Sequence, residues 1–311
     1  MGNVLKKVIK DILAGQGYQV KQTTSVEKKY LRGLQTEWIS KNPQLFAQVY
    51  LQNRRTLSLI SNWISTETLD SSIWRYGVPL GWESKFDDHL ERCGLNDIQM
   101  EVTSSDLMAL LGDYLDHIKY LEIGVSVGKN FLQLCNVFKN AEMSAIDVED
   151  ISPVLESCFE AGTTVWESEE NFEIETLRQT KIEKKFSIRN YVFGDNNNEI
   201  HYIVGDQFSS KTWDILKGKK FNFIFSDGSH SVEAITSELD NLINLELVDR
   251  RNLIVLWDDL FDLKMQNAFV KNANKLCNIF GCGDDHISMY HLFGTYGYKR
   301  NMGLFVFLEP S

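Results

Sequence analysis

The sequence lacks the features that mark several specialised classes of protein. No run of apolar residues approaches the roughly 18 that a membrane span requires, so the sequence predicts no transmembrane segment. Basic residues are outnumbered, with 32 Lys and Arg against 43 Asp and Glu and a net charge of −11. A surface of that sign repels polyphosphate as a whole, which argues against a nucleic-acid partner.

Cysteine is scarce and scattered along the chain. The five cysteines are odd in number, and no two of them have the spacing of a structural zinc site, so reduced thiols are expected. The first residues, Met1–Leu13, interrupt their apolar positions with lysines, which is unlike a secretory signal. Together these features predict a cytoplasmic protein.

The residues that are present suit a globular fold. Hydrophobic residues make up 43% of the chain and charged residues 24%, with eighteen Phe, eleven Tyr and seven Trp. This composition supplies ample material for a core. A length of 311 residues favours one large α/β domain with additions, or two domains.

Residues 1–104 are interpreted as a helical N-terminal region that serves as a cap, an oligomerisation element or a substrate lid. Residues 4–13 place apolar side chains on one helical face and lysines on the other. This stripe favours packing or a homo-oligomer contact, and docking on an anionic membrane surface is the alternative. A second helical pattern follows over residues 45–60, and the aromatic stretch 71–82 is expected to be an ordered loop.

Residues 105–311 alternate short β-branched runs with helical runs, which is typical of βαβ units and a parallel sheet. Strands are predicted at 120–124, 143–147, 200–204, 221–227, 252–258 and 303–309. Helices are predicted at 129–138, 231–245 and 263–279. The long stretch 155–198 is interpreted as an insertion, with a hairpin around 186–203.

A loop containing glycine follows the first predicted strand. Gly124, Ser126 and Gly128 precede an apolar helix, at the place where open α/β sheets bind ligands. Ser126 stands where the nicotinamide fingerprint needs its middle glycine, and Asn130 lies beyond the last, so a diphosphate cradle is disfavoured. The phosphate loop of nucleoside triphosphatases also fails, since no Gly, Lys and Ser or Thr stand in succession.

This loop resembles the glycine loop of the class I S-adenosylmethionine-dependent methyltransferases. The resemblance rests on Glu122, Gly124, Ser126, Gly128 and Asn130. It implies an α/β fold with a Rossmann-like, seven-stranded sheet. It also implies S-adenosylmethionine as the cofactor, with these five residues at its binding site.

Two acids at later strand ends fit the same resemblance. Asp147 ends the second strand about 20 residues past the loop, where a carboxylate can accept hydrogen bonds from both ribose hydroxyls. Asp206 ends the third strand and resembles the family position beside the adenine. Each acid alone is also explained as a helix cap. The glycine loop, Asp147 and Asp206 each lie at the expected place in the alternating pattern, and together they are more specific.

Acids also follow the fourth and fifth strands. Asp227 comes directly after the fourth, and Asp258 and Asp259 come after the fifth. Adjacent parallel strands would bring these carboxylates together, and like charges that close need a neutralising cation. Oxygen ligands without thiolates favour a hard divalent ion, most simply Mg²⁺, with Mn²⁺ or Fe²⁺ as alternatives.

The surrounding segments, FIFSDGSHSVEAITSEL and LIVLWDDL, resemble the metal-dependent macrocin- and mycinamicin-type O-methyltransferases of natural-product and sugar tailoring. The resemblance covers residues 118–262 or so. It implies that Asp227, Asp258 and Asp259 hold the metal, and it assigns His230 to catalysis as general base beside Asp227. The competing interpretation is that the last two acids and the histidine only cap the helices that follow.

The sequence therefore predicts an O-methyltransferase, assisted by a divalent metal, that acts on a hydroxyl of a small molecule such as a sugar or specialised metabolite. A dication would stabilise the alkoxide, and an imidazole is suited to take the hydroxyl proton. The alternatives are a metal-independent N- or C-methyltransferase and a non-catalytic scaffold that binds S-adenosylmethionine. A hydrolase is the third, because G-x-S-x-G from Gly124 to Gly128 matches a nucleophile elbow at Ser126.

Overall fold

The computed structural model describes residues 24–66, 102–126, 128–175, 181–194, 196–293 and 299–309. The predicted helix over residues 4–13 and the predicted loop over 71–82 lie outside these ranges. The division of the chain at residue 104 stays a prediction.

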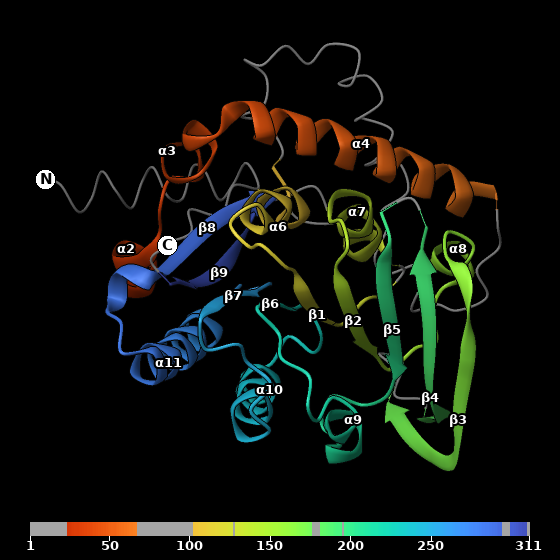
Figure 1. Ribbon diagram of the computed structural model, residues 1–311. Coiled ribbons are helices and arrows are strands. Elements are labelled where there is room, and N and C mark those ends of the chain that lie inside the picture. The colour runs from red at the N-terminus through yellow and green to blue at the C-terminus, as the bar shows by residue number, and fades with distance from the viewer. Residues whose placement is uncertain are drawn as a thin grey trace, which may run out of the picture.

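The described chain forms a mixed sheet with helices on both faces (Figure 1). Its strand order is β3-β4-β5-β2-β1-β6-β7-β9-β8. The strands are β1 Lys119–Ile123, β2 Glu142–Asp147, β3 Glu160–Glu175, β4 Lys181–Phe193, β5 Asn198–Val204, β6 Phe223–Ser226, β7 Asn252–Trp257, β8 Ile287–Phe293 and β9 Lys299–Leu308. The helices are α2 Ser25–Tyr30, α3 Leu34–Glu37, η1 Ile39–Lys41, α4 Pro43–Thr66, α6 Ser104–Gly112, α7 Lys129–Val137, α8 Pro153–Glu156, α9 Ser210–Asp214, α10 Val232–Asn244, α11 Leu263–Phe280 and η3 Asp284–His286.

The centre of the sheet is parallel. Strands β5, β2, β1, β6 and β7 run in one direction, with β2 and β6 on either side of β1. The connections therefore turn in opposite directions on the two sides of β1, and ligands bind such sheets at the carboxyl ends of the strands near that point. On the side beyond β7, β9 pairs antiparallel with β7, and β8 pairs antiparallel with β9. The predicted α/β fold with a Rossmann-like sheet is confirmed.

The predicted number of strands is wrong, because the described sheet has nine rather than seven. Seven of them, from β5 to β8, form the predicted sheet, and β3 and β4 extend it beyond β5. The predicted hairpin is confirmed: β4 pairs antiparallel with β5 from Ser187 opposite Val204 to Phe193 opposite Asn198. The insertion therefore adds to the sheet instead of forming a separate unit.

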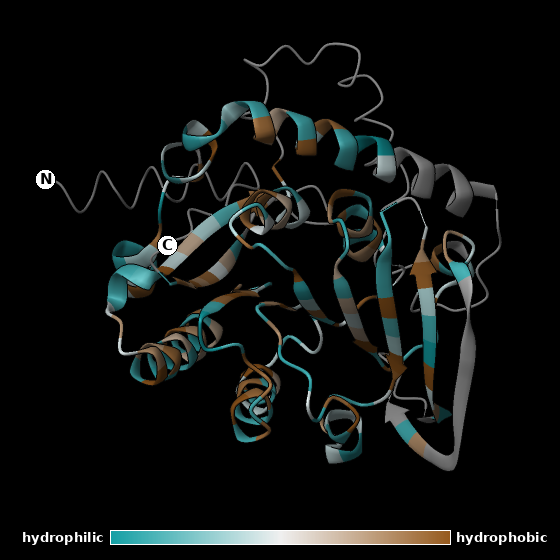
Figure 2. Cartoon of the chain, in the orientation of Figure 1, coloured by the Kyte–Doolittle hydropathy of each residue, from teal (hydrophilic) through white to brown (hydrophobic). Residues whose placement is uncertain are grey.

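Two hydrophobic cores lie on opposite faces of the sheet, because successive side chains of a strand point to opposite sides. Tyr120 packs with Phe131 and Phe138 on the face covered by α6 and α7. Leu121 belongs to the other core, which includes Leu239 of α10. In Figure 2 the ribbons of α10 and α11 carry both brown and teal stretches, as expected for helices with one buried side.

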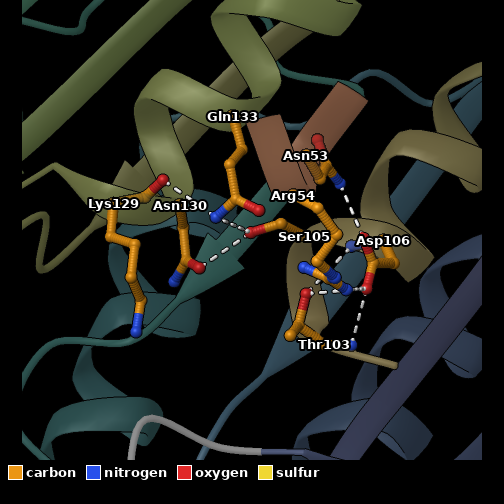
Figure 3. A network of polar contacts seen from close by, with 8 residues as sticks. All are labelled: Asn53, Arg54, Thr103, Ser105, Asp106, Lys129, Asn130 and Gln133. Carbon is orange, nitrogen blue, oxygen red and sulfur yellow. Dashed lines mark hydrogen bonds and ion pairs between the residues drawn. The ribbon is translucent and has the colours of Figure 1, made fainter. Parts of the chain in front are cut away.

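Helix α4 confirms the second helical pattern and crosses above α6 and α7 (Figure 1). Arg54 of α4 forms a fully buried ion pair with Asp106 of α6, and Asn53 donates a hydrogen bond of 2.9 Å to the same carboxylate. Figure 3 shows both α4 side chains directed at this carboxylate. The ion pair therefore fixes the described part of the N-terminal region to the layer that carries the glycine loop.

Helix α2 packs at the other end of the molecule. The side chain of Glu27 accepts hydrogen bonds from Asn301 of β9 at 2.6 Å and Gln266 of α11 at 3.3 Å. Thr24 and Glu27 form a capping box that begins the helix.

Among the residues that the structure describes, no helix has the length and apolar character needed to cross a membrane.

Candidate active site

The glycine loop connects β1 to α7 through an unusual backbone path. Gly124, Ser126 and Gly128 have φ angles of 84°, 53° and 85°, all in the left-handed region. A Cβ atom on Gly124 would lie 2.3 Å from the carbonyl oxygen of Asp227, so this loop packs directly on the one that follows β6. Ser126 adopts the same region with a side chain, which costs about 1–3 kcal/mol.

Asp147 holds this loop in place. Its Oδ2 accepts hydrogen bonds of 2.7 Å from the backbone N–H groups of Val125 and Ser126, and its Oδ1 accepts one of 2.8 Å from Glu149. Burial raises the pKa of Asp147, and these three backbone hydrogen bonds act in the opposite direction. A carboxylate offers about four lone-pair positions, so roughly one position on Oδ1 is left for a ligand hydroxyl.

Glu122 lies buried below the loop on β1. The Tyr120 hydroxyl donates a hydrogen bond of 2.7 Å to Oε2, whereas Oε1 is buried without a hydrogen-bond partner among the described residues. Burial raises the pKa of Glu122 to about 8. The side chain is therefore protonated at neutral pH and can donate a hydrogen bond as well as accept one.

Asn130 belongs to a network that joins α7 to α6 (Figure 3). Ser105 donates a hydrogen bond of 2.8 Å to Asn130 Oδ1, and the amide of Gln133 donates one of 3.2 Å to the Ser105 hydroxyl. In this arrangement the carbonyl oxygen of Asn130 positions the first turn of α7. Its predicted contact with the cofactor stays a prediction.

The loop after β5 reaches the loop after β6. Asp206 accepts a hydrogen bond of 2.9 Å from the backbone N–H of Phe208, which makes a local turn. The next residue, Gln207, accepts a hydrogen bond of 3.4 Å from the Ser229 N–H, and its buried Nε2 has no partner among the described residues. Sequence reasoning missed Gln207. Its position beside Asp206 was the only available signal.

His230 and Asp259 form a pair across the ends of β6 and β7. His230 Nε2 lies 3.3 Å from Asp259 Oδ2, and the histidine side chain is 38% exposed whereas that of Asp259 is 10% exposed. Asp259 has a φ of 55°, in the left-handed region, and lies two residues after the end of β7. The structure thus brings the predicted base together with one of the predicted metal ligands.

The acids expected to hold a metal lie at neighbouring strand ends, as predicted. Ser226 pairs with Trp257 in the sheet, so Asp227 and Asp258 each follow one member of that pair. However, the described residues contain no group of three His, Cys, Asp or Glu side chains placed to hold a metal ion. As placed, the three predicted ligands do not form such a group, and Asp259 contacts His230.

A second buried acid lies behind the end of β6. The Ser226 hydroxyl donates a hydrogen bond of 2.5 Å to Glu238 Oε2 from α10. Burial raises the pKa of Glu238 to about 8, so this side chain also is protonated at neutral pH. Sequence reasoning did not select it, because a single glutamate within a helical pattern carries no functional signal.

No protein-family model and no curated protein matches this chain. Solved structures that are similar include a putative O-methyltransferase from Klebsiella pneumoniae, 11% identical over 88% of this chain and 99% of that one, with a TM-score of 0.38. An O-methyltransferase from Bacillus cereus in complex with SAH is 11% identical over 82% of this chain and all of that one, with the same TM-score.

The MycE methyltransferase of the mycinamycin biosynthetic pathway, in complex with Mg, SAH and mycinamycin VI, is 14% identical over 64% of this chain and 45% of that one, with a TM-score of 0.32.

Proposed function

We propose that this protein is an S-adenosylmethionine-dependent methyltransferase that acts on a hydroxyl group of a small molecule. The observation that carries the proposal is the His230–Asp259 pair, 3.3 Å apart, on the sheet edge that also holds the glycine loop. A histidine held by a carboxylate, and open to a ligand, is the arrangement of a general base.

The residues around the glycine loop fit the cofactor. Asp147 retains a lone-pair position for a ribose hydroxyl, and the buried Oε1 of Glu122 has no hydrogen-bond partner among the described residues. Asp206 lies at the end of β5, and we propose that it lies beside the adenine. When bound, S-adenosylmethionine supplies an electrophilic methyl group on a positively charged sulfur.

The chain's own contribution is to remove a proton and to position the hydroxyl. A carboxylate facing Nε2 favours the imidazole tautomer that carries its proton there, which leaves Nδ1 as the proton acceptor. Nδ1 would accept the hydroxyl proton during transfer, while the carbon–sulfur bond of the bound cofactor would break and S-adenosylhomocysteine would be the leaving group. Asp259 stabilises the imidazolium that results.

The proposed reaction does not depend on a metal ion. The sequence-based prediction places a divalent ion on Asp227, Asp258 and Asp259, but these residues as placed do not fit one. No step is therefore assigned to a metal. The prediction is tested by chelation, as described in the Discussion.

The proposal is tested first by isothermal titration with S-adenosylhomocysteine, the product form of the cofactor. We expect saturable binding at micromolar concentrations, followed by turnover of at least one compound in a screen of sugars and phenols. Absence of binding both with Mg²⁺ and after chelation would contradict the methyltransferase function. Binding without turnover of any acceptor would favour the non-catalytic scaffold.

One observation favours a hydrolase as the second candidate. Ser126 sits in a strand-to-helix turn with a φ of 53°, as the nucleophile of a G-x-S-x-G elbow does. However, the histidine of the site is 3.3 Å from Asp259, and the Ser126 N–H is bound to Asp147. Covalent labelling of Ser126 by a fluorophosphonate probe, lost in Ser126→Ala, would support the hydrolase instead.

A further inference from the structure

Exposed apolar side chains gather on the loops around the candidate active site. Among the residues that the structure describes, six large hydrophobic side chains are exposed. Four of the six lie just beyond the carboxyl ends of β5, β6 and β7: Phe208, Val232, Phe261 and Leu263. Phe208 is 47% exposed and Phe261 is 51% exposed, so each leaves about half of a large apolar surface in water. We call these four side chains the apolar rim.

Three members of the apolar rim follow residues of the site by two positions. Phe208 follows Asp206, Val232 follows His230, and Phe261 follows Asp259. The loops that carry them are joined by the 3.3 Å contact of His230 with Asp259 and by the hydrogen bond from Ser229 to Gln207. The apolar rim and the proposed base therefore belong to the same connected set of loops.

The backbone holds these side chains in place. Val232 and Leu263 are the first residues of α10 and α11. The preceding residues, Ser231 and Asp262, cap these helices by accepting hydrogen bonds of 3.1 Å and 2.8 Å. Two capped helices thus fix an apolar side chain at their first position. Exposed apolar patches can mark interaction sites, and these four side chains lie on loops at the same end of the parallel strands.

The charges on the same loops are mainly negative. Residues 206–211, 227–233 and 258–264 contain six acids and two lysines. Such a field disfavours a ligand that carries phosphate, sulfate or carboxylate near its reacting hydroxyl. It is compatible with a neutral or cationic ligand.

We propose that the apolar rim is the acceptor-binding face, and that the acceptor is an uncharged or cationic molecule whose hydroxyl is attached to an apolar alkyl or aryl body. This inference rests on the proposed function and narrows its substrate class. Free sugars and anionic acceptors, including those with a pyrophosphate, are poor substrates. Burial of each methylene group of the acceptor favours binding by about fourfold at most.

Two glucosides test the inference, because they share their hydroxyl groups and differ in their apolar part. Binding of octyl β-D-glucoside, below its micelle concentration, and of methyl β-D-glucoside is measured by titration into protein saturated with S-adenosylhomocysteine. We expect the octyl compound to bind at least tenfold more tightly. Octyl sulfate, with the same chain and a negative charge, is expected to bind more weakly than octyl glucoside.

Substitutions locate the binding face. Phe261→Ser and Val232→Ser should each weaken octyl glucoside binding several-fold and leave the affinity for S-adenosylhomocysteine unchanged. Val192→Ser is the matched control, because Val192 is 38% exposed on β4 opposite Glu199, near the amino-terminal end of β5. Val192 therefore lies near the amino-terminal ends of the parallel strands, whereas the site lies at their carboxyl ends. Its substitution should change neither the affinity for octyl glucoside nor that for S-adenosylhomocysteine.

The outcomes separate the acceptor inference from the proposed function. Equal binding of the two glucosides, or equal losses in Val192→Ser and Val232→Ser, would overturn the apolar acceptor while leaving S-adenosylhomocysteine binding intact. Failure of the unmodified protein to bind S-adenosylhomocysteine would count against the proposed function instead. Co-sedimentation with phosphatidylcholine vesicles that is lost in Phe261→Ser would show that the rim docks on a membrane, which would also overturn the inference.

Discussion

His230 Nε2 and Asp259 Oδ2 lie 3.3 Å apart at the ends of two adjacent parallel strands. Asp259 has a left-handed backbone with a φ of 55° and lies two residues after the end of β7. It links the residue predicted as a base to one predicted as a metal ligand. The function of the site therefore depends on which partner Asp259 serves.

Removal of either member of this pair should reduce turnover more than it changes binding. We expect His230→Ala to lower kcat by about 10²-fold or more with a small change in KM, since general-base catalysis contributes 10²- to 10⁴-fold. Asp259→Asn should cause a smaller loss of kcat. The control is Asp285→Asn, because Asp285 lies 3.9 Å from His286 away from the loops of the site. An unchanged kcat in His230→Ala would remove the assigned base.

Chelation distinguishes the two roles of Asp259. The structure leads us to expect that protein treated with EDTA retains its turnover, because the acids at the strand ends are not placed to hold a metal ion. Turnover is measured as release of S-adenosylhomocysteine before and after chelation, and again with added Mg²⁺, Mn²⁺ or Fe²⁺. Loss of turnover with EDTA, and its recovery with one of these ions, would support the sequence-based prediction instead.

Asp147 should control cofactor affinity through the glycine loop. Asp147→Ala leaves the N–H groups of Val125 and Ser126 without their acceptor. Hydrogen bonds to a charged group contribute about 1.5–3 kcal/mol, so the dissociation constant for S-adenosylhomocysteine should rise about tenfold or more. Titration calorimetry measures the effect. Asp150→Ala removes an acid of the same loop that pairs with Arg189, and an equal loss there would contradict this role.

The ion pair between α4 and α6 should be important for stability. Arg54→Met leaves Asp106 buried without its cation, and breaking a buried pair from one side typically costs about 3–5 kcal/mol. Urea denaturation measures the free energy of unfolding. Lys275→Met, which breaks the exposed pair with Asp240, should cost less than about 1 kcal/mol. Similar costs for the two variants would show that α4 does not depend on the buried pair.

Glu238 should make the protein less stable as the pH rises. Its pKa is about 8 in the folded protein, against 4.5 for an ordinary glutamate, so between these values the folded state binds more protons than the unfolded state. The free energy of unfolding must then fall with increasing pH over that interval. Glu238→Gln should remove part of this slope in urea titrations at pH 5 to 8. The exposed Glu233 of the same helix offers a control, since Glu233→Gln should leave the slope unchanged.

The sequence was sufficient for the central sheet. Strands such as β6 and β7 are buried on both faces, so each is a continuous run of apolar residues. An acid follows each run. This pattern is local and can therefore be recognised in the sequence. It was not sufficient for the edge strands. In β8, Ile287 and Met289 join one core while Tyr290 and Leu292 join the other, so a short mixed segment becomes a strand only through its pairing with β9.

The candidate site divides in the same way. The amino-acid pattern was enough to place Asp147, Asp227, Asp258 and His230 at or after strand ends, and parallel pairing aligns those ends at one edge of a sheet. What each side chain contacts depends on the folded chain. Asp147 binds the loop backbone, Asp259 faces His230, and Gln207 reaches the loop after β6. These contacts join residues far apart in the chain through left-handed turns and close packing, which depend on several loops at once and not on local sequence.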